Sequence, residues 1–163
     1  MKKTALLIIL SSFTTILFSQ NIFKRNVIYF ELGGNGLFTS VNFERQITKH
    51  PGFGIRLGIG LYSLSSSYLT IPLGVNYLFK LNDAKSFIDL GFGVTYTKAD
   101  VSLYSLAKPR NPNSVNTNYL NFIPSLGYRR QTNKNLMWRV SLTPVFNQYD
   151  GLPFFGVSIG KVF

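Results

Sequence analysis

The feature that most constrains the fold is an alternation of large apolar side chains with small or polar ones, which runs from Val27 to the end of the chain. In the segment 53–61, apolar residues at the odd positions alternate with Gly or Arg at the even positions. Successive side chains of a β-strand point to opposite sides, so a period of two gives each strand one apolar and one polar face. The same pattern returns around 88–96, 138–143 and 155–160. The sequence therefore predicts an all-β protein.

Eight segments carry the alternation, and most of them contain about 10–12 residues, longer than the ~5–6 of an ordinary strand. That length suits the roughly 9–11 tilted residues with which a strand crosses a bilayer. Compact polar turns mostly alternate with longer connections, of which 100–117 is the longest. This arrangement is typical of bacterial outer-membrane barrels, so we expect an eight-stranded antiparallel up-and-down transmembrane β-barrel. The expected strands are 27–36, 37–47, 52–62, 68–79, 87–99, 118–130, 136–146 and 153–163.

The polar faces of these strands carry few charges and many Gly, Ser, Thr and Asn residues, which favours the narrow interior of an eight-stranded barrel over a water-facing surface. Six ionisable residues, three acids and three arginines, point to the same side of their strands as these small and polar residues. Because a buried charge is costly unless it is paired and hydrogen-bonded, we interpret the six as a structural network that fills the lumen. A substrate or ion pathway is the functional alternative. The expected network consists of Glu31, Glu44, Arg56, Asp89, Arg129 and Arg139.

Three prolines conflict with the strand pattern. Pro72, Pro124 and Pro144 lie inside expected strands, where a missing N–H interrupts the hydrogen-bonded ladder. We expect β-bulges or early fraying of the strands at these positions.

The N-terminus has the order of a secretory signal peptide: a short cationic start, an apolar run that ends at Phe18, and a small residue, Ser19. The run contains about 14 residues, fewer than the ~20 that a transmembrane helix needs. We therefore expect a cleaved signal peptide over 1–19 and an outer-membrane barrel domain over 20–163. A retained membrane anchor is the alternative.

Few residues can carry chemistry. The chain has no Cys and one His, His50, which excludes disulfides, thiolate metal sites and most His-based catalysis. The Gly-rich stretch 33–36 lacks the Lys and Ser/Thr of a phosphate-binding loop, so we interpret it as a tight turn. The 17 basic residues outnumber 6 acidic ones, but many occur at one expected rim, which favours anionic lipid headgroups over nucleic acid. We expect no enzyme activity, catalytic residue, cofactor or metal.

Several stretches in order carry a family resemblance: GFGIRLGIG at 52–60, IPLGVNY at 71–77, IDLGFGVTY at 88–96, IPSLGYR at 123–129 and GVSIGKVF at 156–163. With them the chain resembles the small outer-membrane β-barrel proteins of the outer membrane protein A and X type, particularly the compact versions found in Bacteroidota. The resemblance implies insertion into outer-membrane lipid and recognition of the C-terminal Phe163 by the barrel assembly machinery. Members of this class range from structural tethers to adhesins, so the resemblance does not fix an activity.

For function we expect a structural or surface-interaction role, with a closed lumen and a possible extracellular partner at the loop 100–117. The alternatives are a small-solute conduit of the outer membrane and a soluble, secreted lipocalin-like carrier.

Overall fold

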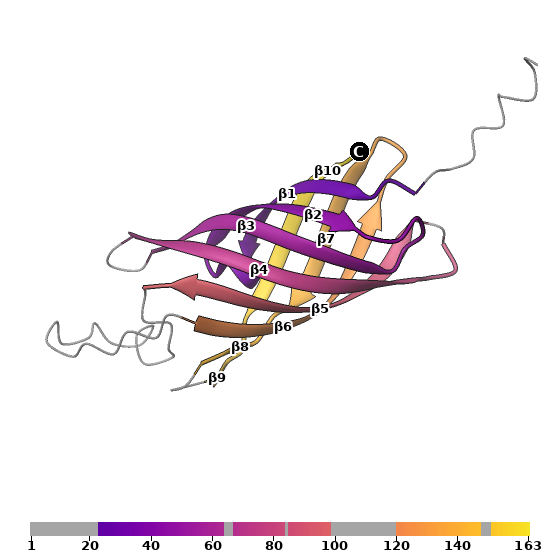
Figure 1. The fold of residues 1–163 in the computed structure, drawn as a ribbon. Helices are drawn as coiled ribbons and strands as arrows, with labels where there is room; N and C mark the ends of the chain where they lie inside the picture. The colour runs from indigo at the N-terminus through magenta and orange to yellow at the C-terminus, as the bar shows by residue number, and fades with distance from the viewer. Residues whose placement is uncertain (1–22, 64–66, 84, 99–119, 148–150) are drawn as a thin grey trace, which may run out of the picture.

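The computed structural model describes residues 23–63, 67–83, 85–98, 120–147 and 151–163 (Figure 1), and the structural statements below concern these residues. The predicted signal peptide, 1–19, and the predicted long loop, 100–117, lie outside them. No helix in the described part of the chain is long and apolar enough to cross a membrane.

The strands close into a single antiparallel barrel. Each of the first seven strands pairs with the next along the chain, and the last strand lies between the first and the seventh. The predicted all-β class and eight-stranded up-and-down topology are therefore confirmed. The wall consists of β1 (Asn26–Gly33), β2 (Thr39–Gln46), β3 (Phe53–Ser63), β4 (Ser67–Lys80), β5 (Ser86–Thr97), β6 (Leu120–Gln131), β7 (Leu136–Leu142) and β10 (Phe155–Val162).

The connections 47–52, 81–85 and 132–135 lie at one end of the barrel, which we call the turn end. The ends of the described barrel meet there too, since Asn26 and Phe163 exchange two backbone hydrogen bonds. The opposite end, which we call the loop end, contains the short 3-10 helix η2 (Gly34–Gly36) between β1 and β2.

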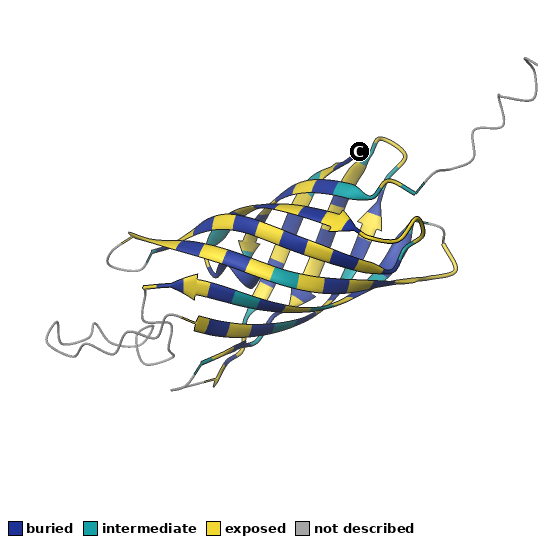
Figure 2. Cartoon of the chain, viewed as in Figure 1, coloured by how far each residue is buried: buried dark blue, intermediate teal, exposed yellow. Residues whose placement is uncertain are grey.

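Exposure alternates residue by residue along the wall, as the two-colour pattern of Figure 2 shows. On β3 every odd position from Phe53 to Leu61 is exposed and every even position from Gly54 to Tyr62 is buried. Among the described residues, 35 large hydrophobic side chains are exposed and 11 hydrophobic residues are buried. The barrel is therefore apolar outside, which is the reverse of the arrangement in a water-soluble barrel.

The last two expected strands are interrupted near the loop end. The segment 136–146 divides into β7 and β8 (Val145–Phe146), and the expected strand 153–163 begins only at Phe155, as β10, with β9 (Gly151–Leu152) before it. The pairings on both sides of the break share one register, which puts Pro144 opposite both Pro124 and Pro153. No extra residue enters either strand, and pairing resumes at β8 and β9, so neither the expected bulge nor the expected fraying is found at Pro124 and Pro144. The strands are broken because Pro has no N–H to donate.

Pro72 produces a milder defect inside β4. The pairing of β4 with β3 is interrupted between Leu73 and Thr70, but the register is the same on both sides of the interruption. On its other side β4 stays paired, with Pro72 opposite Thr95. The expected bulge or fraying at Pro72 is therefore wrong as well, because one missing donor leaves the ladder to β5 intact.

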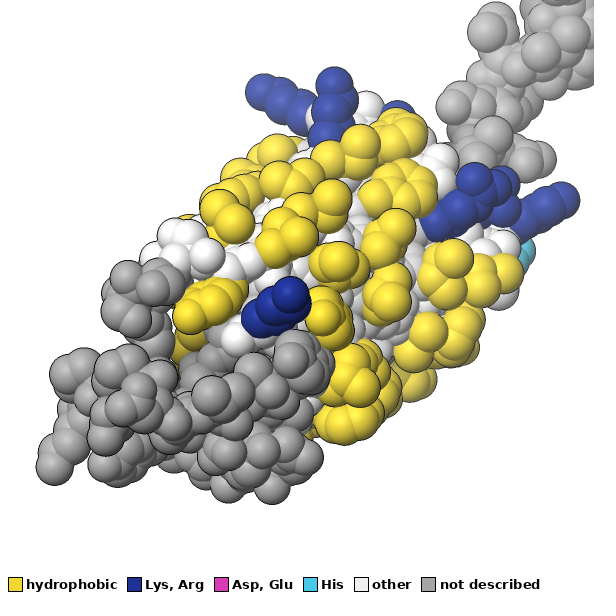
Figure 3. All heavy atoms as spheres, turned by 60° about the vertical axis from the view of Figure 1, so that its left-hand side comes forward, with side chains coloured by type: hydrophobic (Ala, Val, Ile, Leu, Met, Phe, Trp, Pro, Cys, Tyr) yellow, Lys and Arg dark blue, Asp and Glu magenta, His cyan; other side chains and the backbone are white. Residues whose placement is uncertain are grey.

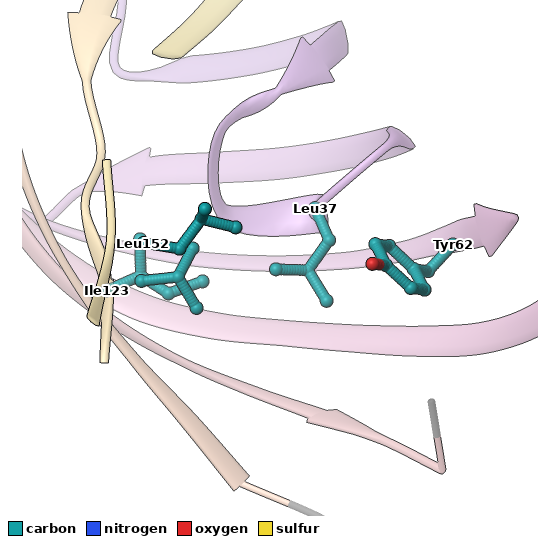
Figure 4. Packing of buried hydrophobic residues seen from close by; sticks show 5 residues of the cluster. Leu37, Tyr62, Ile123 and Leu152 are labelled. Carbon is teal, nitrogen blue, oxygen red and sulfur yellow. The ribbon is translucent and has the colours of Figure 1, made fainter. Parts of the chain in front are cut away.

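The stretch 33–36 forms the predicted tight turn, but the turn folds into the barrel. Gly33 and Gly34 have φ values of 69° and 64°, a conformation that Gly adopts at little cost. Gly34, Asn35 and Gly36 are all buried. The following Leu37 points into an apolar cluster that fills the loop end, four of whose members are labelled in Figure 4. The cluster consists of Leu37, Tyr62, Ile123, Val145 and Leu152.

A second apolar cluster lies inside the barrel at its turn end. It is built from the first residues of β1, the start of β7 and the end of β10. Its members are Val27, Tyr29, Met137 and Val162.

Candidate functional site: charged residues inside the barrel

The six ionisable residues singled out from the sequence all lie inside the barrel. They come from six different strands, β1, β2, β3, β5, β6 and β7, and none of them exposes more than 6% of its surface. Their inward direction follows from the alternation, because each has at least one outward-facing apolar or aromatic neighbour on its own strand. The six residues are Glu31, Glu44, Arg56, Asp89, Arg129 and Arg139.

Arg139 of β7 contacts two of the acids. Its Nη2 lies 2.7 Å from Glu31 Oε1, and its Nη1 lies 3.1 Å from Asp89 Oδ2. Arg139 Nη2 also donates to the Ser158 hydroxyl, which donates in turn to Glu31 Oε1. The guanidinium lies 4.9 Å from the centre of the Tyr29 ring, a distance at which a cation is attracted to the ring face. Arg139 thus joins β1, β5 and β10 to its own strand.

Arg129 of β6 lies directly opposite Arg139 in the sheet register, and like charges in such a pair repel. Glu44 of β2 offsets this repulsion from across the lumen, since it accepts a hydrogen bond from Arg129 Nη1 and lies 3.9 Å from Arg139 Nη1. Asp89 lies between the two arginines and reaches Arg129 at 3.8 Å. Three acids and two arginines therefore form one connected group.

Arg56 stands apart from that group. It lies opposite Glu44 in the register of β2 and β3, but it makes no ion pair with any acid of the described residues. Its Nη2 donates instead to Ser125 Oγ at 2.8 Å. Gly91 and Gly74 make room for the side chain, because a Cβ at Gly91 would overlap Arg56 Nη2 and one at Gly74 would come within 2.9 Å of Nε.

Neutral polar side chains complete the charged interior. Asn76 Nδ2 donates to Asp89 Oδ1 at 3.2 Å, and Gln46 Nε2 donates to Glu44 Oε1 at 3.1 Å. We did not predict these contacts from the sequence. Each of the residues lies on the inward-facing side of its strand, and this position could have identified it as part of the interior. The residues missed in this way are Gln46, Asn76, Ser125 and Ser158.

The arrangement holds opposite charges together inside the barrel. His50, the one His, lies exposed in the turn 47–52, outside the barrel interior. No group of three or more His, Asp or Glu in the described part of the chain could hold a metal ion.

A closed eight-stranded antiparallel barrel with an apolar outer wall and a polar interior is the architecture of small bacterial outer-membrane barrels, and this chain has that architecture. It is similar to the N-terminal β-barrel domain of OprF from Pseudomonas aeruginosa, with a TM-score of 0.59 and 12% identity, over 85% of this chain and 96% of that one. It is also similar to the outer membrane protein Ail from Yersinia pestis, with a TM-score of 0.54 and 9% identity, over 86% of this chain and 99% of that one. Identities this low establish the fold alone. No protein-family model and no curated protein sequence matches the chain.

Proposed function

We propose that this chain is an integral outer-membrane β-barrel protein with a structural or surface-interaction role and no catalytic activity. The observation that carries the proposal is the apolar outer wall. Apolar side chains cover much of the face in Figure 3, with Lys and Arg mainly near its upper margins. An exposed apolar area of this size is unfavourable in water. A bilayer accommodates it, because a closed barrel pairs its backbone N–H and C=O groups within the barrel itself.

The filled interior favours a structural role over transport. An apolar cluster around Leu37 occupies the loop end, the charged residues follow, and a cluster around Val27 occupies the turn end. Eight strands enclose just enough space for side chains. We therefore propose that the lumen is closed and that the charged residues serve to hold strands together.

Two alternatives differ from this proposal in ways that can be measured. A small-solute conduit is favoured by one observation, the buried Arg56 without an ion pair, since an anion path would use such a group. A soluble lipocalin-like carrier requires large apolar side chains inside and polar ones outside, the opposite of the exposure pattern in Figure 2.

Partners are proposed at the two ends of the barrel. An extracellular partner at 100–117 is a prediction from the sequence, as is the cleaved signal peptide 1–19. Phe163 ends the chain just after β10, exposed and hydrogen-bonded through its backbone to Asn26. Recognition of Phe163 by the barrel assembly machinery stays a prediction from the sequence. The assignment to the compact Bacteroidota type also stays a prediction.

The experiment that tests the proposal is expression of the full chain in a Gram-negative host, followed by carbonate extraction of the membranes. We expect the protein in the carbonate-resistant outer-membrane fraction, with different gel mobility before and after boiling. A detergent-free soluble monomer would contradict the proposal. Planar-bilayer recording separates closed barrel from conduit: steady single-channel steps that disappear in Arg56→Gln would favour the conduit.

A further inference from the structure

The outer wall carries a groove of about 690 Å³ that crosses β2, β3, β4 and β5. Its lining is apolar except for two arginines. Arg56 belongs to the barrel interior and reaches the groove only at its floor, next to Gly74. Arg45 lies on the outward face of β2 and is exposed. The groove therefore combines an apolar furrow with one cation on the outer surface.

The sheet register shows how the groove is built. One edge is a row of outward side chains that are direct cross-strand neighbours: Arg45 of β2, Ile55 of β3, Val75 of β4 and Phe92 of β5. Because each residue pairs with the next, the row crosses four adjacent strands without a step. The row has its single charge at one end.

The other edge is the next outward row toward the loop end. It consists of Phe43, Leu57, Leu73 and Val94, which are again direct cross-strand neighbours. Two residues along a strand separate the rows, about 7 Å. This spacing is too narrow for an α-helix, which with side chains is about 10–12 Å across, so an occupant of the furrow has to be thinner, as a hydrocarbon chain is.

The groove runs from the turn end of the barrel into the middle of the wall. Arg45 is the residue before the last of β2, at the turn end, whereas Phe92 lies well inside β5, which begins at Ser86. With strands about 4.8 Å apart, four strands span about 14 Å. Because the strands of such barrels tilt by about 35–45°, a row perpendicular to them descends about 8–10 Å, which stays within one leaflet of the roughly 30 Å hydrocarbon core.

Arg45 is free to bind an anion. Its side chain is exposed, and it makes no ion pair with an acid in the described part of the chain. A guanidinium holds a phosphate group with two parallel hydrogen bonds. In a barrel whose turn end faces the periplasm, Arg45 lies on the side of the periplasmic leaflet.

We propose that this groove is a binding site for a phospholipid of the periplasmic leaflet, with the lipid phosphate on Arg45 and one acyl chain between the two rows. The inference rests on the proposed function, because it requires the barrel to span the outer membrane with its turn end in the periplasm. Charge and shape both favour this occupant: the cation lies at the headgroup end, and the apolar furrow is too narrow for a helix and stays within one leaflet.

Native mass spectrometry of the full, detergent-solubilised chain with added phosphatidylglycerol tests the site. We expect Arg45→Gln to lower the apparent affinity about tenfold, the effect of losing one charge-assisted hydrogen-bond pair. The matched control is Arg130→Gln, which removes the same charge from the turn end of β6, where Arg130 lies 3.5 Å from Asp83. Its lipid binding is expected to equal that of the wild type.

A second pair of variants tests the furrow. Val75→Phe fills the groove, whereas Val157→Phe makes the same replacement at an exposed, outward position of β10. We expect weaker phosphatidylglycerol binding only for Val75→Phe, and weak binding of uncharged diacylglycerol to all forms. Equal binding by Arg45→Gln and wild type, equal binding of both lipids, or no effect of Val75→Phe would overturn the site.

Gel mobility before and after boiling, measured on every variant in vesicles, separates the two proposals. A wild type that fails to insert contradicts the proposed function itself. Inserted variants with unchanged lipid affinity contradict only the phospholipid site.

Discussion

Glu31 and Arg139 are 108 residues apart in the sequence, and their side chains meet at 2.7 Å inside the barrel. Ser158 of β10 lies between them in the register, opposite both residues, and its hydroxyl bonds to each. The contact exists only because β10 inserts between β1 and β7. It therefore joins the closure of the barrel to the charges inside it.

We expect Arg139→Gln to destabilise the barrel by about 3–5 kcal/mol, because it leaves the buried Glu31 carboxylate without a cation and leaves Asp89 with Arg129 alone, at 3.8 Å. Glu31→Gln should cost less, since Arg139 keeps Asp89. The destabilisation of the double variant should differ from the sum of the two single destabilisations by about 0.5–3 kcal/mol. Urea unfolding in lipid vesicles, followed by the fluorescence of the single Trp138, measures all three. A cost below about 1 kcal/mol for Arg139→Gln would contradict the proposed structural role.

A charge on the outer wall tests which face meets lipid. Leu57 is 52% exposed in the middle of β3, so Leu57→Arg should cost about 2–4 kcal/mol in a bilayer. The control, Asn133→Arg, puts the same residue in the exposed turn 132–135 and should change little. The measurement is the folded fraction in vesicles, taken from gel mobility without boiling. Equal folding of both variants would disprove the assignment of the lipid-facing side.

The inward-folded turn at 33–36 makes Gly34 a sensitive position. Gly34 has a φ of 64°, and a Cβ there would overlap the Glu31 carboxylate. Left-handed backbone alone costs an L-residue about 1–2 kcal/mol, and Gly34→Ala should lose at least that much in urea unfolding. Gly151→Ala serves as the control, because its Cβ would meet nothing nearer than a ring atom of Phe146 at 3.3 Å. Equal stability of the two variants would show that the turn is not packed as described.

The opposed prolines predict a local gap in amide protection. Thr143 donates its N–H to Phe154 O at 2.8 Å, toward β10. Successive N–H groups of a strand point to opposite sides, so residue 144 faces Pro124 of β6, where neither proline has a donor. Pro144→Ala restores one donor.

We expect a slowly exchanging amide at residue 144 of that variant, measured by hydrogen exchange with NMR detection. The free energy of unfolding should change little. The new hydrogen bond contributes about 1 kcal/mol, but the unfolded chain without Pro144 has more conformational freedom, which offsets this gain. In Pro153→Ala the new N–H of residue 153 points away from β8, so this amide should exchange fast. Fast exchange at residue 144 would show that the break has a cause other than the missing donors.

The division of residues between the two faces could be predicted from the sequence because it depends only on parity along a strand. Arg56 points inward and Leu57 outward whatever the neighbouring strands do. The same parity identified all six charged residues of the interior. It could not reveal that Pro124, Pro144 and Pro153 lie on one row, since that depends on the register between strands.

The sequence by itself therefore determined an apolar outside, a charged inside and the approximate length of most strands, all of which are local properties. Only the tertiary structure decided which charges meet. Glu44 and Arg56 are cross-strand neighbours, yet Glu44 pairs with Arg129 from the far side of the lumen, and Arg56 bonds to Ser125. The physical reason is that closure brings side chains of distant strands together across a narrow interior, where they compete with the neighbours that pairing within the sheet supplies.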